Sequence, residues 1–117
     1  MKIRLGVIGS RNFTNYDLLY NTIVSHFDVN KIEYVVSGGC IGADLCGKKF
    51  AEQCKLNYKE FLPDWEKFGK SAGFKRNVDI ISNASHVVAF WSGGSQGTRH
   101  SILLALKQKK PVLIIPF

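Results

Sequence analysis

The sequence predicts an α/β protein with a three-layer Rossmann-like fold, in which helices cover both faces of a mainly parallel five-stranded sheet. Short apolar runs alternate with amphipathic helical segments along the chain, and this alternation requires right-handed crossovers between parallel strands. The apolar runs are nearly continuous, as in a sheet that is buried on both faces. Glycine-rich turns follow three of these runs, and in parallel sheets such turns gather at the carboxyl edge, where ligands bind.

The five expected strands are short and rich in branched or aromatic apolar residues. They are expected at residues 3–8, 33–37, 57–62, 86–91 and 111–117. The run at 57–62 is the weakest of the five, because polar residues interrupt it.

The expected helices have apolar residues at helical spacing. They are expected at residues 16–27, 43–55, 74–83 and 98–109. Either Thr14 or Asn15 can cap the first helix, because both carry a side-chain oxygen that accepts a bond from a backbone N–H. Residues 63–73 are expected to form an ordered loop, because the segment contains Trp65 and Phe68.

Length and composition indicate one domain over residues 1–117, with 45% hydrophobic residues to build its core. The net charge of +7 favours a phosphorylated ligand or a polyanion, although the dispersed lysines also fit an ordinary solvated surface. No signal peptide and no apolar run of roughly 20 residues is evident. The three cysteines lack metal-site spacing. We therefore expect a reduced cytoplasmic protein with no metal, no cofactor and no membrane partner.

The three glycine-rich turns are the candidate binding site, because glycine lets backbone N–H groups approach a ligand and the following helix start favours an anion. Three glycines within five residues of the third turn exceed what a helix cap needs, so this turn is expected to hold phosphate, with a plain turn capped by Thr98 as the alternative. The candidate ligand-binding residues of the turns are Gly9, Ser10, Arg11, Gly38, Gly39, Gly42, Asp44, Gly93, Gly94, Ser95, Gly97 and Thr98.

The order of several short motifs resembles a known family. The motifs are Gly-Ser-Arg-Asn-Phe at 9–13, Val-Ser-Gly-Gly at 36–39, Gly-Ala-Asp at 42–44, Asp-Trp at 64–65, Arg-Asn at 76–77 and Gly-Gly-Ser-Gln-Gly-Thr at 93–98. Over roughly residues 3–116 the chain is similar to the YspA-like branch of the SLOG superfamily, named for Smf/DprA and the Lonely Guy enzymes. The resemblance implies a Rossmann-like fold, nucleotide or nucleotide-derived ligands and a homodimer or higher homo-oligomer.

One position departs from the Lonely Guy pattern, which places a glutamate three residues after the threonine of Gly-Gly-x-Gly-Thr. Ser101 stands there in this chain. A carboxylate stabilises the cationic sugar formed during base release, so the pocket is expected to bind but to cleave poorly. Asp44 or Asp64 can replace the missing glutamate only if the fold brings one of these two carboxylates to the ligand. Enzyme activity is left open, with Arg76, Asp44 and His100 as catalytic candidates; the other reading of His100 is a helix-surface residue.

Further side chains have two readings each. Arg11 either grips a phosphate or makes a surface ion pair. The resemblance makes Arg76 the leading side-chain contact for an anion, while Asn77 either contacts the ligand or caps locally. Asp44 either accepts ribose hydroxyls or complements a helix dipole. Trp65 either stacks on a base or belongs to the core.

The leading functional hypothesis is a module that binds a nucleotide or an ADP-ribose-like compound as sensor, carrier or sequestering protein. One alternative is a Lonely Guy-like nucleoside monophosphate phosphoribohydrolase. The second is a DprA-like single-stranded DNA binder, which requires a continuous basic groove, exposed aromatic side chains and strong salt dependence. Because the sequence has no basic arm, nucleic acid is expected to be an unlikely partner.

Overall fold

The computed structural model describes residues 2–117 and confirms the predicted fold class. One all-parallel sheet has the strand order β3-β2-β1-β4-β5. Its strands are β1 (Ile3–Gly9), β2 (Ile32–Ser37), β3 (Asn57–Glu60), β4 (His86–Phe90) and β5 (Val112–Ile115). The order reverses between β1 and β4, so the loops after these two strands diverge to opposite faces and leave a crevice at their carboxyl ends.

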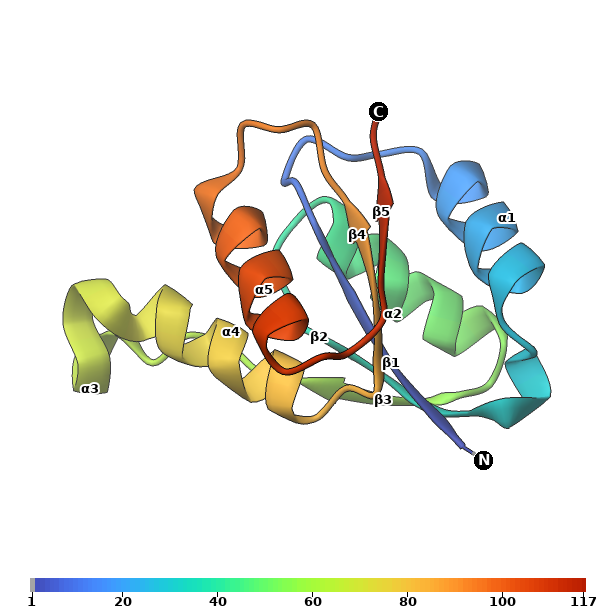
Figure 1. Cartoon of the computed structure of the whole chain (residues 1–117), viewed down its shortest axis with the longest axis horizontal. Coiled ribbons are helices and arrows are strands. Elements are labelled where there is room, and N and C mark those ends of the chain that lie inside the picture. The colour runs from blue at the N-terminus through green and yellow to red at the C-terminus, as the bar shows by residue number, and fades with distance from the viewer. Residues whose placement is uncertain (1) are drawn as a thin grey trace.

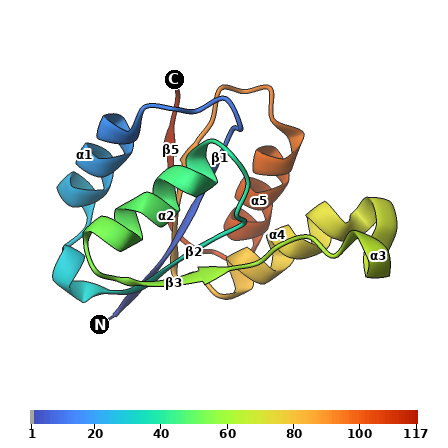
Figure 2. The ribbon, with the colours of Figure 1, turned by 180° about the vertical axis from the view of Figure 1, so that it is seen from behind.

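Helices cover both faces of this sheet (Figure 1). They are α1 (Tyr16–His26), α2 (Ala43–Gln53), α3 (Trp65–Phe68), α4 (Ala72–Ser82) and α5 (Gln96–Lys107), with 3-10 turns at Val29–Lys31 and Gly69–Ser71. Helices α1 and α2 lie on one face, and α4 and α5 lie on the other, as Figure 2 shows from behind. No helix in the described chain is long and apolar enough to cross a membrane.

Two apolar clusters form the core, one on each face of the sheet. Leu5 and Val7 of β1 pack with Phe50 of α2 in the first cluster. Ile8, the next residue along β1, belongs to the second cluster with Ile81 of α4. Successive side chains of a strand point to opposite faces, so a central strand between two helical layers is apolar at almost every position.

Side-chain caps decide where two of the helices begin. The N–H of Leu18 donates to Oδ1 of Asn15 at 3.0 Å, so Asn15 caps α1. Helix α5 begins at Gln96, two residues earlier than expected, because the Ser95 hydroxyl accepts the N–H of Thr98 at 3.3 Å. The cap of α5 is therefore Ser95, and Thr98 lies within the first turn.

The segment expected as a loop at 63–73 contains the one-turn helix α3, followed by a 3-10 turn, and α4 already begins at Ala72. Oδ1 of Asp64 accepts the N–H of Lys67 at 3.1 Å and caps α3. This segment projects beyond the end of α4 (Figures 1 and 2). A single helical turn has no periodic pattern, so the sequence alone did not reveal it.

The pairing of β1 with β4 places the first and third glycine turns side by side. Gly9 is opposite Phe90 in the register, and the N–H of Ser10 donates to the Phe90 carbonyl at 2.9 Å. The second turn follows β2, the other neighbour of β1. All three turns therefore meet at one edge, as the sequence predicted.

Candidate functional site

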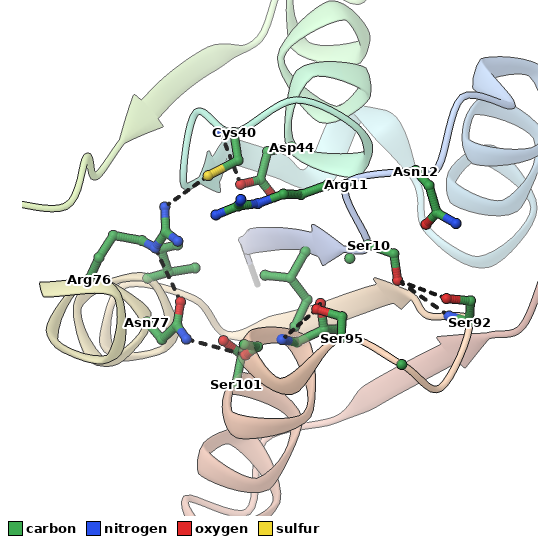
Figure 3. A pocket seen from close by; sticks show the side chains of 16 residues that line it. Ser10, Arg11, Asn12, Cys40, Asp44, Arg76, Asn77, Ser92, Ser95 and Ser101 are labelled. Carbon is green, nitrogen blue, oxygen red and sulfur yellow. Dashed lines mark hydrogen bonds between the residues drawn. The ribbon is translucent and has the colours of Figure 1, made fainter. Parts of the chain in front are cut away.

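A cavity of about 520 Å³ opens at this edge, where the strand order reverses (Figure 3). We call it the switch-point cavity. The predicted site residues that line it are Gly9, Ser10, Arg11, Asp44, Arg76, Asn77, Gly94, Ser95, Gly97 and Thr98. The fold thus brings residues from all three turns and from α4 to one place. Gly38, Gly39, Gly42 and Gly93 lie outside the lining.

A second cavity of about 230 Å³ adjoins the first and shares the lining residues Arg11, Cys40, Arg76, Asn77 and Gly97 with it. The residues that it adds come from the projecting segment and the start of α4: Pro63, Trp65, Lys70, Gly73 and Phe74. The shared residues place the two cavities side by side, and we refer to the two adjoining cavities together as the groove.

The glycines of the second turn support the site rather than lining it, whereas Cys40 and Asp44 of the same turn line the switch-point cavity. A Cβ on Gly38 would run into the Arg76 guanidinium and would lie 2.9 Å from Oδ2 of Asp44. Gly42 has a φ of +90°, and a Cβ there would strike the carbonyl oxygen of Ser10. Glycine at these positions lets the side chains and the first turn pack closely.

Two of the three glycines in the third turn, Gly94 and Gly97, are not required by backbone conformation or by packing. Gly93 has a φ of +93°, which favours glycine. Gly94 and Gly97 do not have a left-handed φ, and a Cβ on either would meet no described atom within 4 Å. Both nevertheless line the switch-point cavity. The absence of side chains there keeps this wall open to a ligand.

Arg76 and Asn77 of α4 connect the second and third turns. Nη1 of Arg76 donates to the Gly38 carbonyl at 2.9 Å and lies 3.5 Å from Sγ of Cys40. Nε of Arg76 donates to Oδ1 of Asn77 at 3.1 Å, and Nδ2 of Asn77 donates to the Gly97 carbonyl at 3.2 Å. None of these bonds uses Nη2 of Arg76. The guanidinium is therefore held at the junction of the two cavities with donor capacity remaining.

Asp44 is buried in the wall of the switch-point cavity, with 8% of its surface exposed. Its Oδ2 accepts the Cys40 N–H at 3.2 Å. Burial raises the pKa of this carboxyl, while the Cys40 N–H and the charge of Arg76 oppose that shift. The fold therefore brings Asp44 to the site, whereas Asp64 lies outside both cavities and caps α3.

Several residues that line the two cavities were not predicted from the sequence to bind a ligand. Ser101 has only 2% of its surface exposed and lines the switch-point cavity, yet its hydroxyl makes no hydrogen bond within residues 2–117. Ser92 precedes the third turn, and its hydroxyl lies 3.4 Å from that of Ser10. The other missed residues are Ile8, Asn12, Cys40, Pro63, Lys70, Gly73, Phe74 and Ile80. For Ser92, its position between β4 and a glycine pair was an available signal.

The structure also shows the surroundings of two more candidate side chains, His100 and Trp65. His100 lines neither cavity; its ring packs edge-on against Phe74 with centroids 4.6 Å apart, and burial lowers its pKa. Trp65 is not a core residue, because 57% of its surface is exposed at the second cavity.

A solved structure of DNA processing protein A from Helicobacter pylori, described for its unique single-stranded DNA binding mode, has the same fold. The TM-score is 0.68 with 21% sequence identity, and the match covers 98% of this chain. The chain spans about 66% of the length of that protein. At 21% identity this likeness shows the fold alone. Membership of the SLOG superfamily and of its YspA-like branch stays a prediction from the sequence.

This likeness overturns two sequence-based predictions. The hypothesis of a module for a nucleotide or ADP-ribose-like ligand is wrong, and so is the prediction that nucleic acid is an unlikely partner. The finding that contradicts both is that the solved protein with this fold binds single-stranded DNA. The expected homo-oligomer also finds no support in the comparisons.

No family model matches this sequence. A curated relative does match: Gene 61 protein of Mycobacterium phage D29 is 30% identical over 119 residues. The alignment covers 94% of this chain and 94% of the relative. The chain therefore belongs to the same family as the phage D29 Gene 61 protein.

Proposed function

We propose that this protein binds single-stranded DNA along the groove formed by the two adjoining cavities. The observation that carries the proposal is the combination of basic side chains and exposed aromatic rings in two adjoining cavities, on the fold of a single-stranded DNA-binding protein. Within the SLOG superfamily we assign the chain to the YspA-like branch, on the motif order in its sequence.

The charge of the groove suits a phosphate backbone. Arg11, Arg76 and Lys70 line it, and Asp44 is the single carboxylate among its lining residues. The whole chain carries a net charge of +7. Lysine and arginine that neutralise phosphates release counterions, which gives binding without sequence dependence and with a strong salt dependence. The Arg11 side chain is exposed at the junction of the two cavities, so it is available to a phosphate.

The aromatic rings of the second cavity suit unpaired bases. Trp65 is 57% exposed and Phe74 is 51% exposed, and both line that cavity. Stacking on such rings contributes about 1–3 kcal/mol per base and is possible only when the bases are unpaired. Lys70 lines the same cavity as the two rings, and Arg11 and Arg76 line both cavities, so cations and aromatic rings lie together there.

The switch-point cavity is larger than a phosphate needs and falls within the range of pockets that hold small molecules. Ile8 and Ile80 give it an apolar floor, and the hydroxyls of Ser92, Ser95 and Ser101 give it polar walls. We propose that one nucleotide of the strand enters this cavity. Its phosphate approaches the open wall at Gly94 and Gly97, where the start of α5 favours negative charge.

Fluorescence anisotropy with a labelled oligothymidylate of about 12 nucleotides tests the proposal. We expect binding to the single strand that weakens steeply between about 50 and about 200 mM salt, and weaker binding to a duplex of the same length. Arg11→Gln should reduce the slope of log affinity against log salt by about 0.7. Lys107→Gln is the matched control, because Lys107 is exposed in the last turn of α5 and lines neither cavity.

Equal affinity for single and double strands would contradict the proposal, because a duplex buries the faces of its bases. Equal salt slopes for Arg11→Gln and Lys107→Gln would place the phosphate contacts outside the groove.

A further inference from the structure

Asp44 is a buried carboxylate in a groove lined by cations, and it lies in the first turn of α2, where its Oδ2 accepts the Cys40 N–H. Among the residues that line either cavity, Asp44 is the one acidic side chain, and it lies beside Arg11 and Cys40 in Figure 3. Its burial is costly for the ionised form. A phosphate placed against it would be repelled. The ligand group that faces Asp44 must therefore offer N–H or O–H donors, since an ionised carboxylate only accepts.

Inside a DNA strand, only the bases offer such donors, because the phosphates and the deoxyribose within the chain carry acceptors alone. Guanine has a ring N–H and an amino group side by side, which match the two oxygens of one carboxylate. Adenine and cytosine place an acceptor nitrogen beside their amino group, and thymine places a carbonyl on each side of its ring N–H. These acceptors would face the carboxylate unfavourably.

A second polar group lines the cavity and, unlike Asp44, has no hydrogen-bond partner within residues 2–117. The Ser101 hydroxyl is almost completely buried and unbonded within residues 2–117. No fully enclosed side-chain oxygen or nitrogen is left unsatisfied in that part of the chain, so this hydroxyl faces the cavity space. It can donate to the acceptors that guanine carries elsewhere on its ring, O6 and N7. The cavity thus presents both an acceptor, at Asp44, and a donor, at Ser101.

We infer that the switch-point cavity selects guanine within a single strand and that Asp44 is the specificity-determining residue. This inference rests on the proposed function. It adds a base preference to binding that is otherwise independent of sequence.

The test uses labelled seven-nucleotide strands with thymine at every position except the central one, which carries guanine, hypoxanthine or thymine. The wild-type protein should bind the guanine strand about tenfold more tightly than the thymine strand. Hypoxanthine lacks the amino group of guanine, so it should lose most of that gain. In Asp44→Asn the guanine-to-thymine ratio should fall to about one, because the amide turns one acceptor into a donor.

Glu33→Gln is the matched control, because it removes the same charge from an exposed side chain of β2 that lines neither cavity. It should keep the tenfold preference. If Asp44→Asn does not fold, the comparison of guanine with hypoxanthine on the wild-type protein still decides the question.

Three outcomes would overturn the inference. Binding of all three strands with equal affinity refutes the base preference and leaves the proposed function standing. Tighter binding of the corresponding RNA strands whatever the central base would assign Asp44 to a ribose hydroxyl. Failure to bind any strand at low salt refutes the proposed function together with the inference.

Discussion

Replacing Gly97 by alanine should stabilise the protein and weaken DNA binding at the same time. Gly97 is the second residue of α5, lacks a left-handed φ, and leaves open space where a Cβ would stand. Alanine in place of glycine within a helix contributes about 0.5–1 kcal/mol. Near a helix end we expect the lower figure, which for a chain of this size raises the melting temperature by about 2 °C.

The same methyl group would stand in the wall of the switch-point cavity. A phosphate oxygen bonded to a backbone N–H must come within about 3 Å of the nitrogen, and the added carbon hinders that approach. Hydrogen bonds to charged groups contribute about 1.5–3 kcal/mol, so affinity for oligothymidylate should fall by about tenfold or more. Thermal melting and anisotropy on one preparation measure both effects.

Gln96→Ala is the matched control, because Gln96 is the preceding residue of α5, is exposed, and lines neither cavity. It should leave the affinity within about twofold. If Gly97→Ala raises the melting temperature and binds as tightly as wild type, the open wall does not hold a phosphate and our reasoning about this turn fails.

Trp65→Ala should weaken binding by about 1–3 kcal/mol, because the base loses its stacking partner. The control is Leu62→Ala, which should leave the affinity unchanged because Leu62 is exposed and lines neither cavity. Equal anisotropy curves for the two variants would remove Trp65 from the site. Arg76→Ala should lower both the affinity and the melting temperature, because the guanidinium also bonds the Gly38 carbonyl; a loss of affinity alone would show that this bond does not stabilise the fold. Asp44→Asn should melt higher than wild type near neutral pH. The raised pKa of Asp44 means that its ionisation disfavours the folded state, so the difference should vanish at about pH 3, where both side chains are neutral; a constant difference across that range in melts followed by circular dichroism would contradict this.

The fold could be predicted from the sequence because its strands are buried on both faces. Leu5, Val7 and Ile8 of β1 supply both apolar clusters, so the strand is read as one continuous apolar run. The ends of the helices were harder to predict from the sequence, because capping side chains within a few residues of each end decide where a helix begins. Ser95 and Thr98 each carry a hydroxyl that can cap a helix, and only the structure shows that Ser95 does so.

Much of the switch-point cavity could also be predicted, because a parallel sheet gathers the turns that follow its strands at one edge. The second cavity could not, because it depends on how the segment from Pro63 to Ser71 packs beside the start of α4. The exposure of Trp65 is a property of that packing. Glycine-rich turns suit any phosphate, whether it belongs to a free nucleotide or to a polymer, so the turns alone could not identify the ligand.

The most direct test of the account is a titration of ¹⁵N-labelled protein with a short oligothymidylate, followed through its backbone amide signals. We predict that the shifts concentrate at the turn after β1, at Gly94 and Gly97, and at the segment that carries Trp65. The claim that the groove binds single-stranded DNA would be contradicted by shifts that concentrate instead on the lysines of α2, which lies on the face of the sheet opposite α4 and α5. It would also be contradicted if no shifts occur at low salt.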